Sequence, residues 1–133
     1  MSSEKLSQDC QATLEINGES YEGSTGRDHG HAEMDALHLF IMSDPGGKKS
    51  VKGSIKYCAE ILGDERTPKV VSCPSRPCCL KCSAVLRALG FSTAKSSSWS
   101  DKSMGSTEWG ASMNVQALLA ACGVDYAKIT GLS

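Results

Sequence analysis

The spacing of apolar positions along the first half of the chain predicts a hairpin followed by two helices. Apolar and polar residues alternate over 13–22 on either side of Asn17-Gly18, a pair typical of a hairpin turn because both positions adopt positive φ. Residues 31–42 contain no glycine or proline and are apolar on most sides, which predicts a buried helix. Apolar residues then recur at helical spacing over 51–62, which predicts a second helix.

The second half of the chain alternates short strands with helices and contains a loop rich in serine and glycine over 95–112. This alternation predicts an α/β fold, specifically a three-layer α/β/α sandwich with a mixed sheet of about five strands. In chain order, the pattern predicts a strand over 67–73, a helix over 79–89, a strand over 91–94, a helix over 115–121 and a strand over 126–129.

Length and composition favour one globular domain over residues 1–133. The chain is 40% hydrophobic and 22% charged with a net charge of −1, which excludes a disordered tail, a collagen-like chain and a highly charged nucleic-acid arm. Residues 1–12 are mostly polar and are expected to be flexible. No signal peptide and no apolar run of about 18 residues is visible, so we expect no membrane association and action in a cytoplasm.

Charge is unevenly divided between the two halves of the chain. Residues 1–66 carry 7 Lys/Arg and 12 Asp/Glu, a net of −5, whereas residues 67–133 carry 7 and 3, a net of +4. The second half therefore has the sign of charge that attracts an anionic partner, but the field is modest, and on charge alone an ordinary mixed surface is the preferred interpretation.

Cysteine is the unusual residue in the composition. There are seven, and four of them lie within residues 73–82. An odd number without a visible secretion signal favours metal binding or catalysis over a disulfide framework. Cys79 and Cys82 are three apart at the start of an expected helix, so both sulfurs can reach one tetrahedral zinc ion, and His31 can supply a nitrogen from the start of the earlier helix. A fourth position left to water is typical of catalytic zinc, and Glu33 is placed to move protons there.

These segments resemble the signature of the zinc-dependent cytidine deaminase superfamily. His31-Ala32-Glu33 matches its His-x-Glu part, and Pro77 with the cysteines that follow matches Pro-Cys-x-x-Cys. The segments look most like those of bacterial polymorphic-toxin deaminases, some of which deaminate cytosine in single-stranded DNA. The resemblance covers residues 13–133 in element order and implies the cytidine deaminase type of α/β/α sandwich.

The resemblance implies a role for each matching residue. His31, Cys79 and Cys82 would hold Zn²⁺. Glu33 would take a proton from the zinc-bound water, the hydroxide would attack C4 of cytosine, and Glu33 would deliver protons to the ring nitrogen and the leaving amine. Backbone near Ala32 and Ser75 would read the base edge. Trp99 either gives a base an exposed stacking face worth about 1–3 kcal/mol or packs its own loop onto the core. The substrate-binding candidates are Ala32, Ser75, His29 and Trp99.

Alternatives stay open for the zinc site. Pro77 is followed directly by Cys78, so Cys78 would replace Cys79 as a ligand if the helix begins irregularly. Cys73 as a fourth protein ligand would make a closed structural site with no reaction. A redox Cys-x-x-Cys pair is a third interpretation, but it leaves His31 and Glu33 unexplained.

The substrate and the partners also have alternatives. Single-stranded DNA is the expected substrate, and RNA, free cytidine or its nucleotides, and adenine are the alternatives, because pocket shape decides between them. Deaminases of free cytidine commonly carry Cys-Ala-Glu and form tetramers, whereas this chain has His-Ala-Glu and is expected to be a monomer. If the chain is a delivered toxin, it acts in the cytoplasm of a target cell and an immunity protein is a second expected partner.

Overall fold

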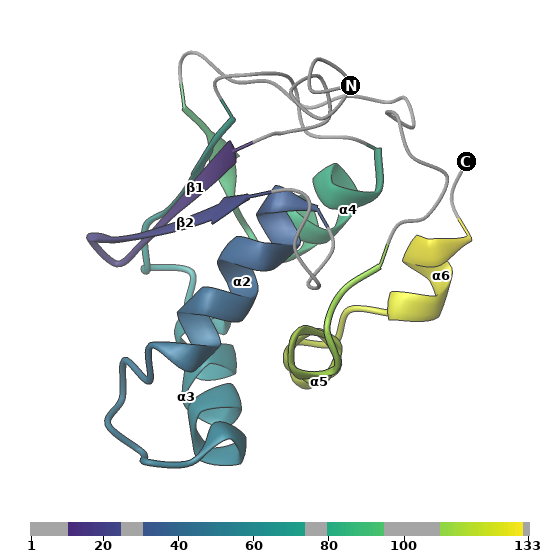
Figure 1. Ribbon diagram of the computed structural model, residues 1–133. Helices are drawn as coiled ribbons and strands as arrows, with labels where there is room; N and C mark the ends of the chain where they lie inside the picture. The colour runs from purple at the N-terminus through teal and green to yellow at the C-terminus, as the bar shows by residue number, and fades with distance from the viewer. Residues whose placement is uncertain (1–10, 25–30, 74–79, 95–109, 132–133) are drawn as a thin grey trace, which may run out of the picture.

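The computed structural model describes residues 11–24, 31–73, 80–94 and 110–131, which form a four-stranded mixed sheet and five helices (Figure 1). A mixed α/β fold is therefore confirmed. The strands are β1 (Gln11–Ile16), β2 (Glu19–Ser24), β3 (Lys69–Ser72) and β4 (Ser92–Thr93). The helices are α2 (Ala32–Met42), α3 (Val51–Gly63), α4 (Leu80–Ala88), α5 (Met113–Ala121) and α6 (Tyr126–Thr130).

The sheet has the strand order β2-β1-β3-β4. Strand β1 pairs antiparallel with both β2 and β3, and β3 pairs parallel with β4. The turn between β1 and β2 has φ of 55° at Asn17 and 86° at Gly18, and Ile16 pairs with Glu19 across it. The two-residue hairpin expected from Asn17-Gly18 is therefore confirmed, although β1 begins at Gln11, two residues before the alternating segment.

Serine caps fix where two of the helices begin. The hydroxyl of Ser50 accepts the backbone N–H of Gly53 at 3.0 Å, so α3 begins at Val51 as expected. The hydroxyl of Ser112 accepts the N–H of Val115 at 3.3 Å, and α5 therefore begins two residues earlier than the apolar pattern indicates. A side-chain acceptor at the first turn satisfies an N–H that has no partner inside the helix.

The strand expected over 126–129 is wrong, because this segment is helix α6. Its N-cap is Asp125, whose carboxylate accepts the N–H of Lys128 at 3.2 Å. Tyr126 and Ile129 lie three apart on one helical face: Ile129 is buried, and the Tyr126 hydroxyl accepts the N–H of Ala111 at 3.0 Å. Among the described residues the sheet consequently has four strands rather than five.

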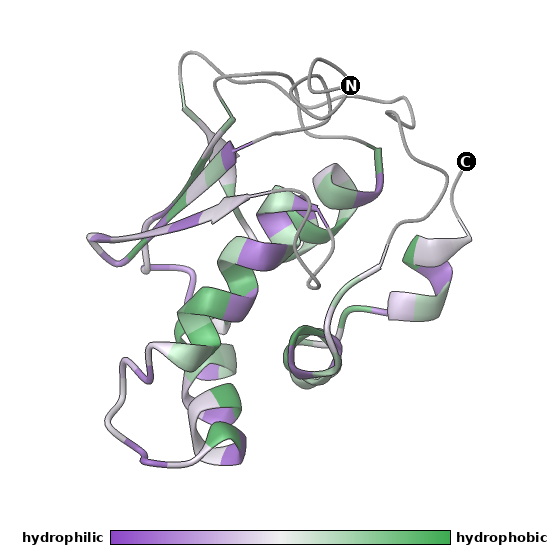
Figure 2. Ribbon diagram, viewed as in Figure 1, coloured by the Kyte–Doolittle hydropathy of each residue, from purple (hydrophilic) through white to green (hydrophobic). Residues whose placement is uncertain are grey.

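A single hydrophobic cluster joins the sheet to the helices. Alternate residues of β1, namely Ala12, Leu14 and Ile16, are almost completely buried. Helix α2 lies against β1 and β2, and α3 and α5 pack against α2. Apolar residues dominate the middle of α2, in agreement with this central place (Figure 2). Within the described ranges, no helix combines the length and the apolar character needed to cross a membrane.

Strand β2 meets the first turns of α2 backbone to backbone at Gly23. A Cβ atom at this position would overlap the carbonyl oxygen of Ala32 and the amide nitrogen of Ala36. The next residue, Ser24, donates its N–H to Oδ2 of Asp35 at 3.0 Å, and Asp35 is buried. The missing side chain and this hydrogen bond together fix the start of α2 against the edge of the sheet.

Replacing Gly23 by alanine should destabilise the protein, because the overlapping atoms belong to a helix backbone and not to a flexible side chain. We expect a loss of about 1–3 kcal/mol or more in the free energy of unfolding, the usual cost of overpacking. Urea unfolding followed by circular dichroism measures it.

The matched control for this substitution is Gly63→Ala at the end of α3, where a Cβ would meet nothing within 4 Å. This variant should be neutral or slightly stabilising, since alanine restricts the unfolded chain. Equal midpoints for Gly23→Ala and the parent protein would contradict the close approach of β2 and α2.

Candidate metal centre

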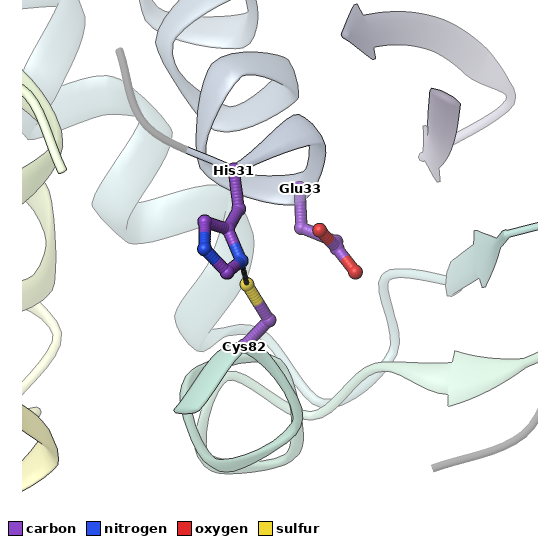
Figure 3. Close-up of side chains that lie close together, drawn as sticks. All are labelled: His31, Glu33 and Cys82. Carbon is purple, nitrogen blue, oxygen red and sulfur yellow. Dashed lines mark hydrogen bonds between the residues drawn. The ribbon is translucent and has the colours of Figure 1, made fainter. Parts of the chain in front are cut away.

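Three side chains from two helices converge at one end of α2. One donor atom each of His31, Glu33 and Cys82 lies within 4.8 Å of the others (Figure 3). Nδ1 of His31 is 3.7 Å from Sγ of Cys82. An imidazole nitrogen, a thiol sulfur and a carboxyl oxygen at this separation form a group that could hold a metal ion.

The local structure at the start of α2 explains how two of these side chains come together. His31 is the N-cap residue, with extended backbone at φ −69° and ψ 162°, and Glu33 lies in the first turn. The carbonyl of His31 accepts the N–H of Asp35 at 2.8 Å, which begins the helix immediately after the histidine. Both side chains are thus held at the amino end of α2, where the backbone dipoles favour negative charge.

Helix α4 contributes the sulfur donor of the group, Cys82. Cys82 is the third residue of α4 and is completely buried, whereas His31 is half-buried. The thiol is therefore shielded from water on the protein side, and the imidazole lies on the more open side of the group. Burial of this kind strengthens electrostatic interactions with a bound ion.

Cys73 contacts the group without joining it. It follows the last residue of β3 and is 5% exposed, and its thiol donates to Oε2 of Glu33 at 3.5 Å. The converging donor atoms at the site are those of His31, Glu33 and Cys82, and Cys73 is not among them. In the described residues, Cys73 therefore occupies the position of a partner for Glu33, not that of a fourth donor.

The structure places some of the predicted site residues and does not describe others. His31, Glu33 and Cys82 are brought together as expected. Ala32 lies between the first two but is buried, with its carbonyl against Gly23 of β2. The remaining candidates, His29, Ser75, Cys78, Cys79 and Trp99, lie outside the described residues.

The sequence pattern did not identify the residues that support the site. Asp35 is 1% exposed inside a largely apolar helix, and a buried carboxyl in such a place requires a hydrogen-bond donor, which Ser24 supplies. The need for such a donor could be inferred from the sequence. The contact between Cys73 and Glu33 could not, because 40 residues separate the two and they come together only in the folded chain.

Two other cysteines lie in α3 and at the end of α5. Cys58 is completely buried in α3, and burial raises the pKa of its thiol to about 11. Cys122 is half-buried, and burial raises the pKa of its thiol as well. Both side chains therefore stay protonated near neutral pH, which disfavours them as metal ligands.

His38 joins α2 to another helix. Its Nδ1 lies 3.0 Å from the hydroxyl of Ser112, the residue that caps α5. His38, seven residues after His31, therefore contributes to the contact between α2 and α5.

In comparisons with known proteins, no family model matches the chain, and no curated protein or solved structure is significantly similar to it.

Replacing Cys82 by alanine should abolish stable binding of a divalent metal, because it removes the buried sulfur from the donor group. Substituting a residue that only hydrogen-bonds to a metal ligand typically lowers metal affinity about 10–100-fold. Removing a ligand itself should therefore lower the affinity at least about 100-fold. Titration with Zn²⁺, and with Co²⁺ to follow thiolate-to-metal absorption, measures it. Cys58→Ala is the control, since it removes a buried thiol away from the group and should bind metal normally.

The same titration distinguishes the two alternatives for the remaining sulfur ligand. The spacing to Cys82 predicts that Cys79→Ala loses metal and that Cys78→Ala keeps it. Loss of metal in Cys78→Ala alone would establish the other register, and unchanged binding in Cys82→Ala would contradict the site itself.

Proposed function

We propose that this chain is a zinc-dependent hydrolase that deaminates cytosine to uracil in single-stranded DNA. The observation that carries the proposal is the position of the Glu33 carboxyl beside a nitrogen and a sulfur donor, all three within 4.8 Å. A closed structural zinc site does not by itself explain why this carboxyl group lies beside His31. A hydrolytic site needs such a group to move protons.

The donor set fits zinc. His31 nitrogen and Cys82 sulfur are 3.7 Å apart, and two ligands of a tetrahedral zinc ion, with bonds of about 2.0 and 2.3 Å, would be separated by roughly 3.5 Å. His31 and Cys82 would therefore hold the ion without moving far. Cys79 is proposed as the third protein ligand from the motif spacing, which leaves a position for water.

The fold supports the same proposal at a finer level. The observed order β2-β1-β3-β4, with β1 antiparallel to its neighbours and β3 parallel to β4, is compatible with the α/β/α sandwich of cytidine deaminases. Helix α2 follows the hairpin and α4 follows β3. His31-Ala32-Glu33 therefore lies at the start of one helix, and Cys82 lies in the first turn of another. We propose the three-layer α/β/α arrangement as the fold of the whole chain.

In the proposed reaction, water adds to C4 of cytosine and ammonia leaves. Zinc, when bound, supplies a water molecule of lowered pKa as the nucleophile. Glu33 accepts a proton from the water as it adds to C4 and donates this proton to the ring nitrogen. It then accepts the proton of the new C4 hydroxyl group and delivers it to the departing amine, which leaves as ammonia. The burial of Glu33, which is 7% exposed, keeps bulk water from competing for these protons.

A polynucleotide substrate is proposed from two features of the second half of the chain. Its net charge of +4 has the sign that attracts a phosphate backbone, and Trp99 lies in a segment rich in serine, where an indole can stack on an unpaired base. Single strands are favoured over duplex because a base must leave the stack to reach a deaminase site.

Glu33→Gln should keep the fold and the bound zinc but lose about 10²–10⁴-fold in turnover, since an amide cannot accept and return the proton. The measurement is uracil formation in single-stranded DNA, with duplex DNA, RNA, free cytidine and an adenine-containing strand assayed in parallel. Glu60→Gln is the matched control because Glu60 is an exposed glutamate on α3.

The outcomes of this assay separate the alternatives. Turnover of Glu33→Gln at the parent rate would remove Glu33 from the mechanism. Conversion of free cytidine alone, or of adenine alone, would keep the proposed chemistry and overturn the proposed substrate. Full zinc content without activity on any base would favour a structural zinc module.

A further inference from the structure

Cys73 connects the central part of the sheet to the carboxyl group of Glu33. Its thiol donates to Oε2 of Glu33 at 3.5 Å, and the exposed fractions are 5% for the cysteine and 7% for the glutamate. Resting on the proposed deaminase function, we propose that Cys73 is a positioning residue, which holds the Glu33 carboxyl in the orientation required for proton transfer. The resemblance to deaminases did not assign this role to Cys73.

The first support is that one oxygen of the carboxyl group is already engaged. Among the described residues, Cys73 is the hydrogen-bond donor to Glu33, and it contacts Oε2. The other oxygen, Oε1, is left for the reacting water and the base. A glutamate with both oxygens free could rotate to bind the ion directly through one or both of them, and would then be a ligand and not a proton carrier.

The second support is the rigidity of the element that carries the thiol. Cys73 directly follows β3, which is paired with β1 on one side and β4 on the other. The carbonyl of Val71, two residues earlier, accepts the N–H of Ala94 at 2.9 Å, which extends the pairing with the β4 side. A donor fixed by a sheet holds its partner more precisely than a donor on a loop.

The third support is the rigidity of the helix that carries Glu33, the acceptor of this hydrogen bond. Glu33 lies in the first turn of α2, which Gly23 and Asp35 fix against β2. The Cys73–Glu33 hydrogen bond therefore joins two rigid parts of the molecule. The side chain of Glu33 is the flexible element between them, and the thiol removes much of its freedom.

The test compares Cys73→Ala with Cys73→Ser in the full-length, zinc-loaded protein. The alanine variant loses the donor, so kcat on single-stranded DNA should fall about 10–100-fold, as for other groups around a metal site, with KM within about twofold of the parent. The serine variant keeps a donor and should retain kcat within a few-fold. Both should bind one equivalent of zinc. Cys58→Ala, which also removes a completely buried thiol, should leave kcat unchanged.

A second measurement observes the hydrogen bond directly, without activity or metal. The infrared S–H stretching band that disappears in Cys73→Ala identifies this thiol. In Glu33→Ala the band should move to higher frequency, because its acceptor is gone. The measurement uses the parent and Glu33→Ala proteins in their zinc-free form, and Cys73→Ser, which also lacks this thiol, assigns the band if Cys73→Ala folds poorly.

Each outcome has a definite meaning. Loss of zinc from both Cys73 variants would make Cys73 a ligand and overturn the proposal, as would an unchanged kcat in Cys73→Ala or an unshifted S–H band in Glu33→Ala. A parent protein that deaminates no substrate would overturn the proposed function, and with it the catalytic purpose of the contact. The infrared shift would in that case still establish the Cys73–Glu33 hydrogen bond itself.

Discussion

Burying the carboxyl group of Glu33 is the constraint on which the candidate site depends. Removing such a group from water is costly unless hydrogen-bond donors and favourable dipoles replace the water. The chain supplies both, because Glu33 lies at the amino end of α2 and accepts a hydrogen bond from the thiol of Cys73. The same burial places the carboxyl beside His31 and Cys82, so the group that is expensive to bury is also the one next to the metal donors.

The position of the site depends on the position of α2, which a small number of contacts with the hairpin determines. The helix lies across the β1–β2 hairpin, and a backbone contact and one hydrogen bond hold its first turns there. Its apolar residues belong to the common core, while its polar residues are concentrated at the end where the site lies. Packing energy therefore comes from the middle of the helix, and the site occupies the end, where side chains are free to serve chemistry rather than packing.

Much of this could be predicted from the sequence, and the exceptions have physical reasons. Asn17-Gly18 identified the hairpin, and apolar spacing identified four helices, because these signals are local. Helix α6 was mistaken for a strand because five residues are too few for periodicity to distinguish the two, and the capping role of Asp125 was the better signal. His31 and Cys82 followed from motif spacing, whereas the contact of Cys73 with Glu33 forms only in the folded chain, and no local pattern contains it.

The glycine at position 23 has a consequence for which sequences can adopt this arrangement. At this position a single methyl group would strike a helix backbone, so every residue larger than glycine carries a cost in stability that glycine does not. Its distance of eight residues from His31 is set by the length of the connection between β2 and α2. We therefore expect glycine at that distance before His-x-Glu, followed by aspartate two residues after the glutamate, in any chain that keeps this approach of β2 to α2.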